Sequence, residues 1–170
     1  KNFKGIITVY SEVGRGTSFN IIIPALASYE IEQQEREEEN IKGGNERILL
    51  IDDEKMIVDS INTILQNLGY NVTYFSDCRI AFDNFSKRAE DFDIIITDYT
   101  MPYMTGIELT RLIKNIRNDI PVILSSGYIN RNLEEAAAGA GVDFVLKKPL
   151  MTKELSVFLR KVLDENYKSK

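Results

Sequence analysis

The feature that most constrains the fold is a regular alternation, from Arg47 onward, of short apolar runs with segments of helical periodicity. Short apolar runs bounded by polar residues are typical of strands buried on both faces of a sheet. Such runs predict strands at 48–51, 72–75, 94–96, 121–124 and 144–146. Apolar residues at the spacing of one helix face predict helices at 57–68, 80–89, 107–116, 133–140 and 155–163.

This alternation of strands with helices predicts an α/β fold. Parallel strands need long crossover connections, and right-handed crossovers place helices on both faces of the sheet. We therefore expect a three-layer, doubly wound, five-stranded parallel sheet. About 120 residues carry the pattern, which is enough for an independent core.

The start of the chain predicts a different structure, a β-hairpin. Residues 6–10 and 19–23 are rich in β-branched and aromatic side chains, and Gly14 and Gly16 between them permit a tight turn. Pro24 closes the second strand. Two strands alone are only marginally stable in water, so we expect this hairpin to be a fragment of a larger domain.

An acidic run separates the two parts. Residues 30–40 hold six glutamates and one arginine, which leaves 20 of the 21 basic and 20 of the 26 acidic residues elsewhere. This composition is typical of a solvated linker or an exposed helix, which Glu32 and Arg36 favour through their i,i+4 spacing. Gly43 and Gly44 are expected to end such a helix and free the chain. We therefore predict a linker at 28–45.

Composition excludes several classes of function. The 170 residues include no histidine and one cysteine, Cys78, which excludes histidine-dependent catalysis, an internal disulfide and a cysteine zinc site. There is no basic stripe with interleaved aromatics, and no apolar run approaches the roughly 20 residues of a membrane span. We therefore expect a cytoplasmic segment without nucleic-acid or membrane contact. Because Lys1 is not an initiator methionine, we expect an excerpt of a longer protein.

Polar side chains gather where the predicted strands end. Asp52 and Asp53 follow the first strand and Asp98 the third, whereas serines 125–126 and lysines 147–148 follow the fourth and fifth. Binding sites of open α/β sheets lie at this carboxyl edge. Carboxylates about 4 Å apart repel by about 4 kcal/mol per pair at an effective dielectric of about 20, which a divalent cation would offset. Oxygen ligands suit Mg²⁺ or Mn²⁺, and an aspartate can act as a nucleophile toward phosphorus.

Taken together, these motifs resemble those of the response-regulator receiver domain, over residues 46–166. The similar segments are LIDDE at 50–54, ITDYTMPYMTG at 96–106, LSSG at 124–127 and KPL at 148–150. The combination is far more specific than any one segment. The resemblance implies a flavodoxin-like fold with the strand order 2-1-3-4-5.

The resemblance also implies a role for each residue of this edge. Asp98 would accept a phosphoryl group from phosphohistidine, Ser126 would be the switch hydroxyl and Lys148 would bind the phosphate. The ligands implied for Mg²⁺ are Asp52, Asp53, Asp98 and the backbone carbonyl of Thr100. Of Asp52 and Asp53, Asp53 would be the more direct ligand.

One position departs from the pattern. The family that the segment resembles often has an aromatic residue three positions before the lysine, where it acts as a switch. Here Val145 takes that position, and the aromatic residue is its neighbour Phe144. The sequence leaves open whether a shift in register lets Phe144 serve instead.

Residues 1–27 resemble the C-terminal tail of a histidine-kinase ATPase domain, through GIITV at 5–9 and SEVGRGTSF at 11–19. In that family the glycine-rich stretch lies near the nucleotide phosphates. Gly14, Gly16 and Thr17 would therefore contact ATP, but only in the intact parent domain.

Both resemblances together imply a hybrid sensor histidine kinase, which a membrane segment elsewhere could anchor. The chain would be its receiver module, a phosphoacceptor rather than a turnover enzyme. Phosphohistidine in the same parent chain would donate the group, and a histidine phosphotransfer protein would be a further partner. Two alternatives stay open. One is a haloacid-dehalogenase-like phosphatase, although Thr100 replaces the second aspartate usual there, and the other is a receiver-like interaction module that is not phosphorylated.

Overall fold

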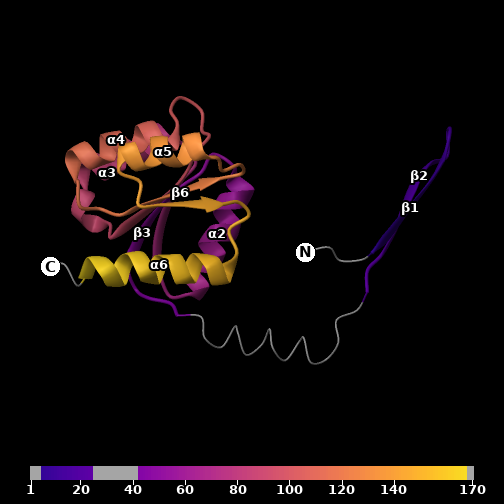
Figure 1. Ribbon diagram of the computed structural model, residues 1–170, viewed down its shortest axis with the longest axis horizontal. Coiled ribbons are helices and arrows are strands. Elements are labelled where there is room, and N and C mark those ends of the chain that lie inside the picture. The colour runs from indigo at the N-terminus through magenta and orange to yellow at the C-terminus, as the bar shows by residue number, and fades with distance from the viewer. Residues whose placement is uncertain (1–4, 25–41, 168–170) are drawn as a thin grey trace. The chain divides into compact units, whose positions relative to one another are not determined.

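The computed structural model describes residues 5–24 and 42–167, with side chains as far as Asp164. The chain divides into two compact units, Lys1–Asn40 and Ile41–Lys170, which are described separately (Figure 1). Most of the predicted linker, including Glu32 and Arg36, lies outside the described residues. Within the described ranges, none of the helices has the length and apolarity that a membrane crossing requires.

The first unit contains the predicted hairpin. Strands β1 (Ile6–Glu12) and β2 (Gly16–Ile22) pair antiparallel. Gly14 and Gly16 adopt φ values of 79° and 102°, a region that glycine reaches without steric cost. Four apolar residues on one face of the hairpin are exposed: Ile7, Val9, Phe19 and Ile21. The hairpin thus presents an apolar face that it does not cover itself.

The second unit is built on a five-stranded sheet in the order β4-β3-β5-β6-β7. Its strands are β3 (Arg47–Ile51), β4 (Asn71–Phe75), β5 (Ile94–Asp98), β6 (Val122–Ser126) and β7 (Phe144–Lys147). Every neighbouring pair is parallel, with Ile48 beside Ile94 and Asp98 beside Ser125. The predicted parallel sheet and its 2-1-3-4-5 order are confirmed.

Helices cover both faces of this sheet, as predicted. They are α2 (Lys55–Asn67), α3 (Cys78–Lys87), α4 (Gly106–Ile116), α5 (Arg131–Ala140) and α6 (Thr152–Tyr167). Figure 1 shows α6 on the opposite side of the sheet from α4 and α5. Helix α3 begins before the predicted residue 80 because the Asp77 side chain accepts a hydrogen bond from the Arg79 amide. It ends at Lys87, and Ala89 falls in a short 3₁₀ turn, η1 (Ala89–Asp91).

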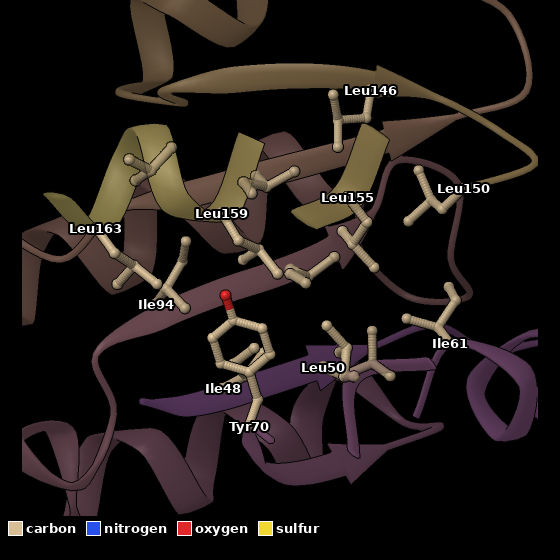
Figure 2. Packing of buried hydrophobic residues seen from close by; sticks show 14 of the residues in the cluster. Ile48, Leu50, Ile61, Tyr70, Ile94, Leu146, Leu150, Leu155, Leu159 and Leu163 are labelled. Carbon is tan, nitrogen blue, oxygen red and sulfur yellow. The ribbon is translucent and has the colours of Figure 1, made fainter. Parts of the chain in front are cut away.

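The apolar runs of the strands are continuous because a hydrophobic core covers each face of the sheet. Ile48 and Leu50 of β3 face the core that includes Leu155 and Leu159 of α6. Figure 2 shows these side chains meeting between the sheet and α6. The alternate residues of β3 pack with α3 and α4 in the other core, which includes Leu49, Ile51, Phe85 and Leu109. A strand covered on both sides has no solvent-facing position to fill with a polar residue.

The expectation that Gly43 and Gly44 free the chain is wrong for these two residues. The Gly44 amide donates a hydrogen bond to the Leu68 carbonyl, with the two atoms 3.0 Å apart. A Cβ on Gly43 would collide with the same carbonyl oxygen. These glycines therefore permit a close approach of two backbone segments rather than a loose joint.

We expect truncation of Leu159 to lower the free energy of unfolding by about 2–5 kcal/mol, because Leu159→Ala leaves a cavity in a closed core. Leu159 has no exposed surface, whereas Val157 on the same helix is 58% exposed. Urea unfolding followed by circular dichroism measures the change. Val157→Ala is the control and should cost far less; equal losses for the two variants would contradict the described packing.

Candidate functional site

The aspartates predicted from the sequence converge at the carboxyl edge of the sheet. Asp52 directly follows β3 and Asp98 ends β5, and these two strands are neighbours. One carboxylate oxygen from each of Asp52, Asp53 and Asp98 lies within 4.8 Å of the other two. Asp52 and Asp98 are buried, with 1% and 5% of their surface exposed. Three carboxylates thus share a small volume, two of them buried and Asp53 open to solvent.

Lys148 joins two of these carboxylates. Its Nζ lies 2.7 Å from Asp52 Oδ2 and 2.7 Å from Asp98 Oδ1. Its backbone amide donates to the Ser126 carbonyl at 2.9 Å, which fixes the end of β7 beside β6. Lys147, the alternative in the sequence, is exposed. One ammonium group among three carboxylates leaves the cluster with an excess of negative charge.

Backbone groups hold the carboxylates in place. The Thr100 amide donates to Asp98 Oδ2 at 2.9 Å, and the Glu54 amide donates to Asp52 Oδ1 at 3.0 Å. The loop after β5 folds back so closely on its own start that any side chain at Gly106 would collide with the Asp98 carbonyl. Thr100, whose carbonyl the resemblance implies as a metal ligand, therefore lies in the turn that holds Asp98.

The electrostatics follow from burial and from these ion pairs. Burial raises the pKa of Asp52 above its usual value, although Lys148 and the Glu54 amide oppose this. Burial by itself lowers the pKa of Lys148, but its hydrogen bonds to Asp52 and Asp98 raise that pKa above the usual value. Lys148 therefore stays a cation at neutral pH.

The Ser126 hydroxyl is turned toward its own loop. Ser126 Oγ donates to the Tyr128 carbonyl at 2.8 Å and accepts from the Tyr128 amide at 3.3 Å. Ser126 also lines an open cleft of about 490 Å³ together with Thr100 and Tyr128. Tyr128 could not be predicted from the sequence, because its contribution is a backbone carbonyl that has no sequence signature. Ser125, by contrast, is buried and its hydroxyl lies 3.4 Å from the Thr97 carbonyl.

The side chains of Val145 and Phe144 lie on opposite faces of β7. The Phe144 ring packs on Phe158 of α6, with ring centroids 5.5 Å apart. Val145 packs on the opposite side, in the cluster that includes Leu124 and Leu133. Because neighbouring residues of a strand point to opposite faces, Phe144 does not take the place of an aromatic residue at 145.

Gly14, Gly16 and Thr17, which the sequence relates to ATP, belong to the first unit. The two glycines shape the turn between β1 and β2, and Thr17 Oγ1 lies 2.8 Å from Ser11 Oγ across the hairpin. The structure thus gives each of them a local structural role.

The donor set of the aspartate cluster fits a divalent metal ion. Its donors are all oxygen, its net charge is negative, and its oxygens are close enough to share one ion. Mg²⁺ takes one or two carboxylates and keeps several waters, which suits a site where Asp53 is more exposed than its neighbours. The cluster therefore meets the requirements for Mg²⁺.

Comparison with known proteins places the second unit in a family. Residues 48–160 match the response regulator receiver domain. The chain is 29% identical to the aerobic respiration control sensor protein ArcB of Escherichia coli K12 over 166 residues, or 96% of this chain and 21% of that protein. It is 30% identical to the sensor kinase CckA of Brucella abortus in an alignment of 177 residues that covers 97% of this chain and 18% of that protein. The chain thus spans about a fifth of the length of these relatives.

A solved structure gives the same result for the fold. It is the receiver domain of the sensor histidine kinase PA1611 from Pseudomonas aeruginosa PAO1, with a magnesium ion coordinated in its active-site cleft. The TM-score is 0.64 at 26% identity, covering 71% of this chain and 99% of that one.

We expect Mg²⁺ at ten times its dissociation constant to stabilise the chain by about 1.4 kcal/mol, because binding to the native state alone adds RT ln(1 + [L]/Kd). This corresponds to a rise in Tm of about 5 °C for a domain of this size. Asp53→Ala should remove the rise, since it removes one carboxylate of the cluster, whereas Asp59→Ala, which changes an exposed carboxylate outside it, should retain it. Thermal unfolding with and without Mg²⁺ measures both, and an undiminished rise in Asp53→Ala would contradict the assignment.

Proposed function

The chain belongs to the response regulator receiver domain family, and on that basis we propose that it accepts a phosphoryl group on Asp98 from a phosphohistidine. The observation that carries the proposal is the contact of the Lys148 ammonium with both Asp52 and Asp98 at 2.7 Å, beside Asp53. This arrangement supports a nucleophilic carboxylate next to a cation that can bind the incoming phosphoryl oxygens.

In the proposed reaction, a carboxylate oxygen of Asp98 attacks phosphorus. The new O–P bond forms as the N–P bond of phosphohistidine breaks. The electron pair of the broken N–P bond returns to the imidazole nitrogen of the donor. The Thr100 amide, 2.9 Å from Asp98 Oδ2, keeps the carboxylate oriented for this attack. Lys148 binds a phosphoryl oxygen. Mg²⁺ held by Asp52, Asp53, Asp98 and the Thr100 carbonyl would neutralise charge on the phosphoryl oxygens.

The Ser126 hydroxyl is proposed to change partners afterwards. It now donates to the Tyr128 carbonyl, and in the phosphorylated state it turns to a phosphoryl oxygen. A shift of a two-state equilibrium from 1:99 to 99:1 requires about 5.5 kcal/mol. Hydrogen bonds to charged groups contribute about 1.5–3 kcal/mol each, so the contacts of Ser126 and Lys148 together approach that amount.

We further propose that the parent protein is a hybrid sensor histidine kinase. In this proposal residues 1–27 end its ATPase domain, 28–45 form a linker and 46–166 form the receiver. The relatives ArcB and CckA align over 96% and 97% of this chain, which leaves too few residues unaligned to omit most of the hairpin, and this supports the assignment. The uncovered apolar face of the hairpin would pack in the ATPase domain, where Gly14, Gly16 and Thr17 would lie near ATP.

The cellular setting belongs to the same proposal. The phosphohistidine donor would lie in the parent chain, and a histidine phosphotransfer protein would receive the group from Asp98. Both steps would take place in the cytoplasm.

Labelling with acetyl phosphate and Mg²⁺, followed by mass mapping, tests the assignment of Asp98. We expect a phosphoryl group that is stable to acid and labile to base, because an acyl phosphate has this stability. Asp98→Asn should reduce labelling to background, whereas Asp59→Asn, at an exposed carboxylate that pairs with Lys55, should not. Full labelling of Asp98→Asn would contradict the proposal. Sustained turnover of a small phosphate ester would favour the phosphatase alternative, and no labelling of the unchanged chain would favour the interaction module.

A further inference from the structure

Residues 42–46, just before β3, are held within the second unit by hydrogen bonds from separate elements. Ser156 of α6 donates through Oγ to the Lys42 carbonyl at 2.6 Å, and Ser156 is 2% exposed. The side-chain amide of Asn71 donates to the Asn45 carbonyl at 2.8 Å. With the bond from the Gly44 amide to the Leu68 carbonyl, this segment contacts α6, the start of β4 and the end of α2.

A buried ion pair reinforces these bonds. Arg160 of α6 lies with Nη2 2.6 Å from Glu46 Oε1, and Glu46 is 8% exposed. Arg160 Nε also donates to the Tyr70 hydroxyl at 3.0 Å. Figure 2 shows this hydroxyl pointing toward α6. A buried carboxylate is tolerated only when it is paired. The burial of the Glu46 carboxylate therefore depends on the position of α6, which carries its partner Arg160.

Gly43 and Gly44 pack closely against the groups that hold the segment. A Cβ on Gly44 would collide with the Glu46 carboxylate and approach Arg160 Nη2, and a Cβ on Gly43 would collide with the Leu68 carbonyl. We call the set of Lys42–Glu46, Tyr70, Asn71, Ser156 and Arg160 the junction clamp. Any displacement of α6 along its axis must therefore strain or open the junction clamp.

The other end of α6 is close to the site in the chain. Helix α6 begins at Thr152, four residues after Lys148, whose ammonium contacts Asp52 and Asp98. Leu150, Leu155 and Leu159 are buried in one core and fix the connecting turn and the helix together. Ser156 and Arg160 are four residues apart, so they lie on one face of the helix.

We propose that the junction clamp couples the state of Asp98 to the segment that precedes Lys42. Phosphorylation draws Lys148 from Asp52 toward the phosphoryl oxygens, the start of α6 follows, and the junction clamp opens. The clamp is thus closed in the resting state, and its opening releases the end of the linker from α6. This inference rests on the proposed function of Asp98.

Amide hydrogen exchange measured by NMR on the full 170-residue chain, with Mg²⁺ and with or without beryllofluoride, tests the coupling. We expect the Gly44 amide to exchange about tenfold faster when beryllofluoride is bound, within the usual range of allosteric coupling. Because coupling is reciprocal, Ser156→Ala and Arg160→Met should bind beryllofluoride more tightly, by up to the same factor. Ser156→Ala removes a single hydrogen bond and so keeps the test valid if Arg160→Met fails to fold.

Val157→Ala, on the exposed side of the same helix, is the matched control and should bind beryllofluoride as the unchanged chain does. The inference is overturned if beryllofluoride shifts the resonances of Asp98 and Thr100 while Gly44 exchange and the affinities of both clamp variants stay unchanged. If beryllofluoride shifts no resonance at the site, the proposed function fails and the inference falls with it. These two failures are therefore distinguished by the same spectra.

Discussion

The candidate site depends on the pairing of one ammonium group with two buried carboxylates. Lys148 lies 2.7 Å from both Asp52 and Asp98, and without it these carboxylates would be buried with only backbone amides as partners. Buried carboxylates without a counter-charge are strongly unfavourable. Lys148 therefore stabilises the resting site, and in the proposed reaction it is also the group that binds the incoming phosphoryl oxygens. This double role makes the site sensitive to a change of charge at Asp98.

The sheet brings these groups together. The strand order places β3 beside β5, β5 beside β6 and β6 beside β7, so four strands that are far apart in the sequence end at one edge. Apolar cores on both faces fix that register, because a slip by one residue would turn each strand's side chains to the wrong face. The position of the site residues at this edge thus depends on two apolar cores that contain none of those residues.

Much of this arrangement follows from local sequence. Short apolar runs predicted the strands and helical spacing predicted the helices. The polar residues after the strands, combined with the strand order that the receiver-domain resemblance implies, predicted that Asp52, Asp53 and Asp98 meet. The roles of these residues in phosphoryl transfer stay predictions. The structural features that could not be predicted from the sequence depend on contacts between distant segments. The close packing of Gly43 on the end of α2 contradicts the flexibility that paired glycines predict. The face on which Phe144 lies is set by Phe158, and the pairing of Glu46 with Arg160 joins residues from the two ends of the unit.

The most direct test of the account is a crystal structure of the chain with Mg²⁺ and beryllofluoride. The account predicts beryllium bonded to a carboxylate oxygen of Asp98, with Lys148 Nζ and Ser126 Oγ both within hydrogen-bond distance of its fluorines. A structure in which beryllofluoride lies elsewhere, while Lys148 still bridges the two aspartates and Ser126 still bonds to Tyr128, would contradict it.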